Sequence, residues 1–317
     1  MKFPIAVAAN NKNDKIRQIS SSGAVFYELA GYVIKNHGIV CGARYDENWN
    51  VVHGYADTME RVMAFIGSKY VQSSVGNLFK KVKEFLDEKR LVLFSGTPCQ
   101  IEGLKMFLQK DYENLITVDL VCHGVPSPKV WQEYIDLRSD GRPVTSVNFR
   151  DKTEGWVRFS LRMKLEGGKE YRKNQFEDLY MKGFLQDIYL RPSCYNCYFK
   201  GIQRKSDITL ADLWKCQSIA PDLFDDKGTS LILIQSQNGM EIWNDIKKNF
   251  VYKKLTLDDA KLSNPNMTES VSKNVKREKY YSGNKSFEEL EKITYVRKPS
   301  FVRRIFRKMK KSAKYLK

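Results

Sequence analysis

The chain has 317 residues, of which 42% are hydrophobic and 29% are charged. This length is sufficient to bury a core without cross-links, and six cysteines are too few for a disulfide scaffold. The formal net charge is +17, but ten basic residues and no acidic ones fall between residues 297 and 317. The rest of the chain is therefore only mildly basic. A nucleic-acid-binding domain carries its charge on a folded face, so we expect no nucleic-acid partner.

The start of the chain and its apolar runs favour a cytoplasmic protein. The first fifteen residues contain only a short apolar patch, shorter than the apolar region of a signal peptide, and then become polar. No apolar run reaches the roughly 18 residues that a membrane span needs. We therefore expect a cytoplasmic location, with reduced thiols available as ligands.

Strands and helices alternate in the first part of the sequence. The expected elements are a helix at 24–38, strands at 39–45 and 51–56, a short helix at 58–66, an amphipathic helix at 75–89, a strand at 91–96, a helix at 98–108 opened by Pro98, a strand at 115–124 and a helix at 126–137. Alternation of this kind from residue 75 to 137 predicts an α/β layer with parallel strands.

After residue 142 the pattern changes to short segments that alternate apolar and polar residues. The expected elements are antiparallel strands at 144–152, 156–165 and 169–176, a helix at 176–190, strands at 206–214 and 229–236 and a helix at 239–250. The sequence predicts an α/β (α+β) fold: a mixed sheet with flanking helices, an antiparallel portion and a cysteine-rich loop. We expect one catalytic unit over 1–295, with an α/β part to about 140 and a β-rich part from about 141, followed by a basic tail at 296–317.

Four cysteines stand in three sequence contexts: Cys99 in SGTPCQ, Cys122 in LVCHG, and Cys194 with Cys197 in PSCYNC. The C-x-x-C pair supplies two thiolates on one turn, and each single cysteine follows an apolar, strand-like run. Four thiolates suit a zinc ion or an iron–sulfur cluster, and these residues alone leave both open. The helix start beside Cys99 favours its thiolate form, whereas Cys122 alone is more typical of a core residue.

Three stretches rich in glycine and hydroxyl groups are candidates for binding a nucleotide diphosphate. They are SSSG (20–23), GSKYVQSS (67–74) and SGTP (95–98), and they offer backbone donors, hydroxyls and one lysine, Lys69. None matches an established dinucleotide or phosphate-loop pattern. Each stretch by itself is more typical of a turn or a helix cap.

Seven ordered motifs give the chain a family resemblance. They are SSSGAVF, GSKYVQSSVG, LFSGTPCQIEGL, VDLVCHGVPSPKVW, MKGFLQDIYLRPSCYNCYFKG, SDITLADLW and DDKGTSLILI. Over roughly residues 5 to 285 the sequence resembles the beta-subunit family of coenzyme F-420 hydrogenases and dehydrogenases. That family includes 7-hydroxymethyl chlorophyll a reductase and many bacterial proteins found with polysaccharide-biosynthesis genes. The resemblance implies an FAD-binding iron–sulfur oxidoreductase that exchanges electrons between one 4Fe–4S cluster and a two-electron substrate.

The resemblance also implies roles for particular residues. The expected cluster ligands are Cys99, Cys122, Cys194 and Cys197, with Cys41 lying elsewhere. The residues expected along the FAD are Ser21, Ser22, Gly23, Gly67, Ser68, Lys69, Tyr70, Gln72, Ser73, Gly96 and Thr97. His123 and Trp214 are expected beside a small hydride donor or acceptor, either coenzyme F-420 or another molecule. A redox partner protein and a role in polysaccharide biosynthesis are further expectations.

The sequence departs from the family pattern in two places. Members often carry an N-terminal ferredoxin segment, but no cysteine precedes Cys41, so we expect any cluster to use the four cysteines above. Lys215 and Cys216 follow Trp214 where relatives tend to have a glycine, which makes Cys216 a candidate substitute ligand. The competing hypothesis is a non-catalytic zinc-binding module with a basic interaction tail.

The basic tail has an amphipathic pattern. Its apolar residues fall close to one helical stripe, and basic residues occupy the remaining surface. This pattern is typical of a helix that lies on an anionic membrane, which predicts a peripheral association with the inner face of the cell membrane. A solvated tail and docking on an acidic partner protein are alternatives that the same residues allow.

Overall fold

The computed structural model describes residues 2–283 and 286–294 and divides the chain into two compact units, Met1–Asn274 and Val275–Lys317. The second unit contains the helices α11 (Lys276–Ser282) and α12 (Phe287–Thr294). The expected boundary at residue 296 falls in a part of the chain that the structure does not describe, and it stays a prediction. The amphipathic tail also lies outside the described residues.

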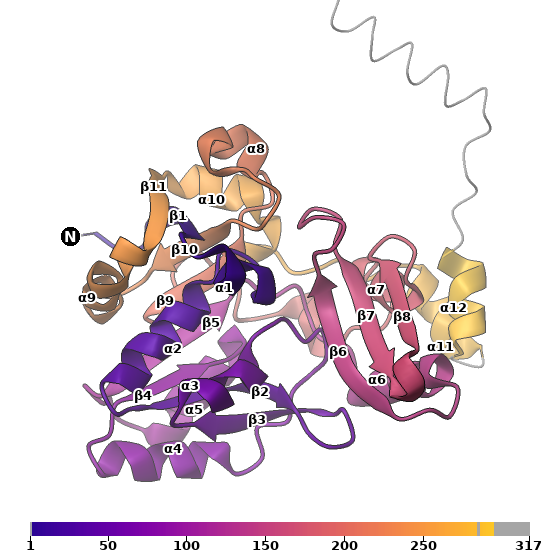
Figure 1. Cartoon of the computed structure of the whole chain (residues 1–317), viewed down its shortest axis with the longest axis horizontal. Coiled ribbons are helices and arrows are strands. Elements are labelled where there is room, and N and C mark those ends of the chain that lie inside the picture. Colours follow the sequence, from indigo (N-terminus) through magenta and orange to yellow (C-terminus); the bar gives the residue numbers. More distant parts are fainter. Residues whose placement is uncertain (1, 284–285, 295–317) are drawn as a thin grey trace, which may run out of the picture. The chain divides into compact units, whose positions relative to one another are not determined.

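The first unit is built on a large mixed sheet (Figure 1). In spatial order its eight strands, counted over the described residues, are β11 (Phe250–Leu255), β1 (Ile5–Asn11), β10 (Ser230–Ile234), β9 (Ile208–Asp212), β5 (Leu115–Leu120), β4 (Val92–Ser95), β2 (Ile39–Tyr45) and β3 (Val51–Ala56). The β2–β4, β4–β5 and β5–β9 pairs are parallel. The alternation of strands and helices therefore gives the parallel layer that the sequence predicts, and antiparallel strands extend it at both edges.

Helices cover both faces of this sheet. The helices of the first unit are α1 (Asp14–Ile19), α2 (Val25–Lys35), α3 (Met59–Val62), α4 (Leu78–Asp87), α5 (Pro98–Leu108), α6 (Pro128–Ser139), α7 (Leu179–Leu185), α8 (Cys216–Ile219), α9 (Gln237–Ile246) and α10 (Leu257–Ser263). Leu93 packs into the cluster that contains residues of α2 and α9, whereas its neighbours Val92 and Phe94 pack with α4 and α5. Strand β4 is thus buried on both faces, which explains its continuous apolar sequence.

A smaller antiparallel sheet forms the second layer of this unit. It consists of β6 (Val144–Asp151), β7 (Ser160–Leu165) and β8 (Glu170–Asn174), and Figure 1 shows it beside α6 and α7. Aromatic rings pack these helices against the sheet. The ring centroid of Phe149 in β6 lies 4.8 Å from that of Trp131 in α6 and 5.7 Å from that of Tyr180 in α7. The predicted fold class is confirmed.

One expected helix is shorter than its sequence pattern indicates. The predicted helix at 176–190 is only α7, Leu179–Leu185, because the side chain of Asp178 caps it at Met181 and the chain turns at Asp187. Asp187 adopts a φ of 58°, a left-handed conformation that aspartate tolerates better than most residues. The turn directs residues 188–197 towards the end of β5. Among the described residues, no helix has both the length and the apolar character to span a bilayer.

Candidate functional site

The four predicted cysteine ligands come from neighbouring places in the fold. Cys99 lies in the first turn of α5, directly after β4, and Cys122 follows β5. Because β4 and β5 are adjacent parallel strands, both residues lie at the same edge of the sheet. Cys194 belongs to a 3₁₀ turn, Pro192–Asn196, and Cys197 directly follows it. A hydrogen bond of 2.9 Å from Arg191 N to Val125 O connects this turn to the segment after Cys122.

The thiols are near enough to affect one another electrostatically. Burial raises the pKa of Cys122 to about 12, with smaller contributions in the same direction from Cys99 and Cys194. Burial also raises the pKa of Cys194, and Cys197 and Cys99 add to that effect. The ammonium group of Lys200 opposes both shifts. The four cysteines therefore form one electrostatic neighbourhood, which we call the cysteine cluster.

Backbone donors and a lysine surround the cysteine cluster. The N–H groups of Gly124 and Val125 donate to the thiols of Cys122 and Cys194, respectively, and lower their pKa values against the larger effect of burial. Lys200 Nζ donates to the carbonyl of Cys122 at 2.7 Å. Gly124 has a φ of 144°, and a Cβ at this position would lie 3.3 Å from Cys194 Cβ. Hydrogen bonds to sulfur and a close glycine backbone suit a buried thiolate centre.

The other two cysteines lie elsewhere. Cys41 is fully buried in the core beneath α4 and α5. Cys216 is buried in a separate core cluster, where its Sγ lies 3.4 Å from Thr229 Oγ1 and 3.4 Å from Ala220 O. Within residues 2–283 and 286–294, no group of three or more His, Cys, Asp or Glu side chains is arranged to hold one metal ion. A 4Fe–4S cluster, in contrast, binds each thiolate through a different iron atom.

The hydroxyl-rich stretches meet in the structure. Both the backbone N and the Oγ of Ser68 donate to Ser21 Oγ, each at 2.8 Å. Lys69 Nζ turns back to the carbonyls of Ile66 and Gly67, at 3.2 and 3.1 Å. Burial lowers the pKa of Lys69 to about 7. Two of the three stretches therefore form one surface with a lysine held against it.

The third stretch connects this surface to the cysteine cluster. Gln100 Nε2 donates to Ser73 Oγ at 2.9 Å, and Thr97 N donates to Gln100 Oε1 at 2.9 Å. Thr97 Oγ1 lies 3.1 Å from Cys99 Sγ. Gln72 N also donates to the carbonyl of Pro126, at 3.1 Å, in the segment that follows Cys122. The predicted flavin residues and the cysteine cluster are therefore contiguous.

Close packing fixes the position of the first serine stretch. A Cβ on Gly23 would lie 2.2 Å from Ala9 O and 2.8 Å from Ser230 N, so only glycine fits against these strands. Gly23 N donates to Ser230 Oγ at 2.9 Å. The Oγ of Ser22 is buried and has no hydrogen-bond partner among the described residues. An unpaired buried hydroxyl at this point is available to a bound ligand.

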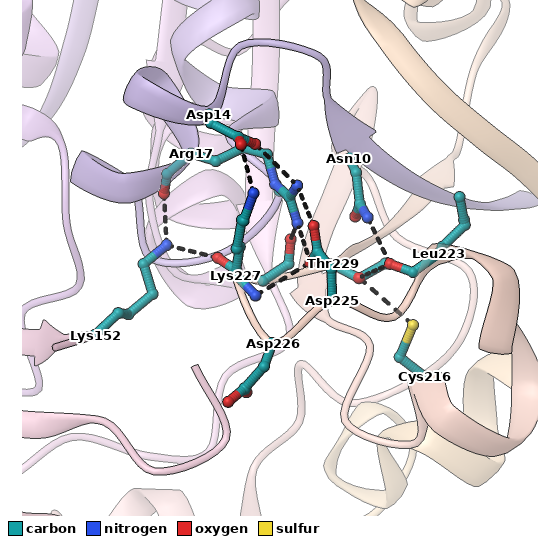
Figure 2. Close-up of polar contacts among 12 residues, drawn as sticks. Asn10, Asp14, Arg17, Lys152, Cys216, Leu223, Asp225, Asp226, Lys227 and Thr229 are labelled. Atoms are coloured by element: carbon teal, nitrogen blue, oxygen red, sulfur yellow. Dashed lines mark hydrogen bonds and ion pairs between the residues drawn. The ribbon is translucent and has the colours of Figure 1, made fainter. Parts of the chain in front are cut away.

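Figure 2 shows a network of polar contacts around Arg17 and Lys152. Buried Arg17 donates to both carboxylate oxygens of Asp225, at 2.6 and 2.7 Å, and to Gly228 O at 3.0 Å. Lys152 Nζ donates to Lys227 O at 2.8 Å. A Cβ on Gly228 would lie 2.9 Å from Ser22 Cα. The loop that contains Asp225 and Gly228 is thus held directly against the serine stretch.

The central polar residue of this region is Arg150, which the sequence did not single out. Arg150 is 2% exposed and donates to Tyr70 Oη at 3.0 Å, to Asp212 Oδ2 at 3.1 Å and to Ser21 O at 3.3 Å. Its guanidinium carbon lies 4.9 Å from the ring centre of Trp214. One signal was available: a charged residue follows Phe149 at the end of a strand with a buried face. Arg150 therefore joins two predicted flavin residues to Trp214.

The two residues predicted to contact the substrate have different surroundings. Trp214 is 43% exposed and stacks on buried Trp156, with ring centroids 5.2 Å apart and planes inclined by 7°. His123 Nδ1 accepts from Asn266 Nδ2 at 2.8 Å, and its Nε2 lies 2.7 Å from Asp187 Oδ1. With Asn266 as the donor, the proton of neutral His123 belongs on Nε2, facing Asp187.

His123 and Trp214 are linked through intermediate residues. The rings of His123 and Phe184 have centroids 4.8 Å apart, and the same separation joins Phe184 to Tyr70. Tyr70 in turn receives a hydrogen bond from Arg150, which packs on Trp214. The structure does not record a direct contact between the two predicted residues. They stand at the two ends of a continuous series of side chains.

A cysteine cluster that adjoins glycine- and hydroxyl-rich loops is typical of a redox protein. Residues 89–260 match the family model for the C terminus of the coenzyme F420 hydrogenase/dehydrogenase beta subunit, and the chain belongs to this family. The family indicates a redox protein of the F420 hydrogenase beta-subunit type. No curated protein matches the chain.

A solved structure supports the fold. The F420-reducing [NiFe] hydrogenase complex from Methanosarcina barkeri, studied as a xenon derivative, contains a chain with a TM-score of 0.58 and 19% sequence identity. The match covers 90% of this chain and 95% of that chain. At this level of identity the similarity establishes only the arrangement of helices and strands. The assignment of the site residues depends on the geometry described above.

Proposed function

We propose that this protein is an FAD-dependent oxidoreductase that exchanges electrons between one 4Fe–4S cluster and a small two-electron substrate. The observation that carries the proposal is the contact of 3.1 Å between Thr97 Oγ1 and Cys99 Sγ, which joins the predicted flavin residues to the predicted ligands. A bound flavin exchanges electrons singly or in pairs, so it supplies the conversion between cluster and substrate.

The cluster would be held by Cys99, Cys122, Cys194 and Cys197. Their mutual influence on pKa and the N–H groups of Gly124 and Val125 support this assignment. The protein's own contribution is to shield three of the thiolates partly from water and to supply backbone donors to Cys122 and Cys194, both of which tune the reduction potential of such a centre.

FAD would lie along the surface formed by the three hydroxyl-rich stretches. The buried, unpaired Oγ of Ser22 supports this assignment, as do the donors that converge at Ser21 and Ser68. Lys69 would neutralise part of the pyrophosphate charge. The remaining expected contacts are Gly23, Gly67, Tyr70, Gln72, Ser73, Gly96 and Thr97.

The substrate would exchange a hydride beside His123 and Trp214. The exposed, flat ring of Trp214, supported by Trp156, suits a planar partner such as a deazaflavin of the F-420 type or another small ring compound. His123 would hold or move a proton at Nε2, where Asp187 orients it. The resemblance to bacterial proteins found with polysaccharide genes extends the proposal to polysaccharide biosynthesis.

Purification without oxygen, followed by absorbance and metal analysis, tests the proposal. We expect bound FAD and a cluster whose iron and sulfide are present in equal amounts. A colourless protein with one zinc ion would contradict the proposal and establish the competing zinc-binding module.

The location of the protein is a separate part of the proposal. Residues 296–317 would bind the anionic inner face of the cell membrane, because their ten basic residues each contribute about 1 kcal/mol near such a surface. Co-sedimentation with anionic and neutral vesicles tests this, with a chain that ends before Arg297 as the control. Equal binding by both chains would remove the membrane role.

A further inference from the structure

The cysteine cluster reaches the protein surface on one side. Cys99 is exposed, whereas Cys122, Cys194 and Cys197 are partly buried. Cys99 and Met106 lie about two turns apart on one stripe of α5, and the Met106 side chain is 76% exposed. The residue after Cys197 is Tyr198, which is 89% exposed. Because electron transfer weakens steeply with distance, this side is where electrons enter or leave most readily.

This exposed side combines large apolar side chains with positive charge. Between Ile188 and Ser206 there is no acidic residue, while four basic residues occur: Arg191, Lys200, Arg204 and Lys205. Backbone carbonyls hold two of these cations in place, since Lys200 Nζ donates to Asn266 O at 2.7 Å and Arg204 Nη2 to Met267 O at 3.0 Å. Exposed aromatic, methionine and arginine side chains are the residues that protein interfaces favour.

A small hollow provides an anchoring point. It has a volume of about 180 Å³ and is lined by Pro98, Tyr198, Lys200 and Arg204, and also by the acidic residues Glu102 and Asp119. Its position next to Cys99 places it between α5 and the C-x-x-C loop. Side chains that insert into a hollow of this kind commonly contribute much of the binding energy of an interface.

We propose that this surface, formed by Cys99, Met106, Arg191, Tyr198, Arg204 and Lys205, is the docking site of a small acidic one-electron carrier protein. The inference rests on the proposed function and names the partner of that site. The positive charge of this surface disfavours two other occupants. The chain's own residues 297–317 are basic, and a second copy of the chain would bring a net charge of +17. Lys205 is already paired with Glu102 at 3.2 Å, so an acidic partner gains mainly from Arg191, Lys200 and Arg204, and the same charges accelerate its approach.

The electron balance fixes the stoichiometry of this exchange. Each reduced carrier loses one electron at the surface and leaves oxidised. Two carriers therefore supply the two electrons that, with one proton from water, make up the hydride equivalent given to the substrate. The reverse reaction reduces two carriers and releases the proton.

A charge-reversal experiment tests the docking site. The probe is an acidic ferredoxin with a single [2Fe–2S] cluster, which carries one electron, and its affinity in the oxidised state is measured by calorimetry with the full chain at low and high salt. The variant is Arg191→Glu with Lys205→Glu, and the matched control is Lys164→Glu with Lys173→Glu, two exposed positions on the small sheet. We expect the first pair to raise Kd at low salt by at least about tenfold and the control to change it by less than about twofold.

Further measurements separate docking from the proposed function. Reduction of flavin and cluster by dithionite should be equal in all variants, while reduction by reduced ferredoxin should slow in parallel with the loss of affinity. Tyr198→Ala should weaken binding at high salt as well, because its contribution is apolar. No ferredoxin binding by the native chain, or equal losses in both charge-reversed pairs, would overturn the docking site. Absence of flavin and cluster would instead overturn the proposed function.

Discussion

Thr97 Oγ1 and Cys99 Sγ lie 3.1 Å apart, at the N-terminus of α5, where Thr97 is the N-cap residue. This contact connects a residue of the hydroxyl-rich surface with a residue of the cysteine cluster. Thr97 N also donates to Gln100 Oε1 at 2.9 Å, and Gln100 Nε2 donates to Ser73 Oγ at 2.9 Å. The start of one helix therefore organises both halves of the proposed site.

Replacement of Thr97 tests whether this hydroxyl acts on the thiolate. The Thr97 hydroxyl lies 3.1 Å from both Cys99 Sγ and Gln100 Oε1, and a deprotonated Cys99 can only accept from it. In Thr97→Val the shape is kept and the hydroxyl is lost, so a Cys99 thiolate loses this donor and becomes harder to stabilise when it gains negative charge. We expect a lower reduction potential of the cluster, measured by redox titration followed by electron paramagnetic resonance. Thr97→Ser retains the hydroxyl and should retain the native potential; equal shifts in both variants would show that the hydroxyl plays no part.

The four cysteines of the cluster should differ in function from the buried Cys41. We expect Cys122→Ser to lose most of the bound iron and sulfide, because a serine oxygen is a poor substitute for a soft thiolate ligand. Cys41→Ala removes a fully buried thiol that packs only in the core, and its iron content should be native. Iron and sulfide analysis of both variants tests whether Cys122 is a ligand. A native iron content in Cys122→Ser would exclude Cys122 as a ligand.

Local sequence patterns predict the parallel part of the fold well. Strand β4 is a short apolar run, and Pro98 marks the helix that follows it, so both elements are visible without knowledge of the tertiary structure. Strand β1 was missed, since its pairing is entirely non-local: Ile5 lies opposite Ile234 of β10. A short run of five apolar residues followed by two asparagines does not reveal such a partner.

The candidate site shows the same difference between features that are local in the sequence and features that depend on tertiary contacts. Cysteines are rare, and the spacing of Cys194 and Cys197 is informative by itself. Arg150 is one of many basic residues, and its role arises only when folding brings Ser21, Tyr70 and Asp212 around it. The cysteines can therefore be predicted as site residues, because their residue type determines their chemistry. Arg150 cannot, because its role depends on contacts that form only in the folded chain.

Lys69 gives the proposed flavin site a specific dependence on pH. Burial lowers the pKa of Lys69 to about 7 in the free protein, so its amine is protonated below that pH and neutral above it. A pyrophosphate binds the protonated form more strongly, and the Kd for FAD should therefore rise as pH increases above 7. Lys69→Ala should bind FAD more weakly at pH 6 and should not show this rise. Fluorescence titration of FAD into the apoprotein measures both effects, and identical pH profiles would exclude Lys69 from the site.

Arg150 and Asp212 should be energetically coupled. Arg150 donates to Asp212 Oδ2 at 3.1 Å, and their side chains are 1% and 17% exposed. Arg150→Ala leaves a largely buried carboxylate without its main partner, which typically costs about 3–5 kcal/mol of the free energy of unfolding. Asp212→Asn in addition removes the uncompensated charge, so we expect the double variant to recover part of this loss.

Urea unfolding of the native chain, both single variants and the double variant measures the coupling, with the exposed Arg172→Ala as a control for the loss of an arginine. Additive losses would show that the two residues act independently. A coupling greater than about 1 kcal/mol would establish that Arg150 and Asp212 stabilise the fold as a pair.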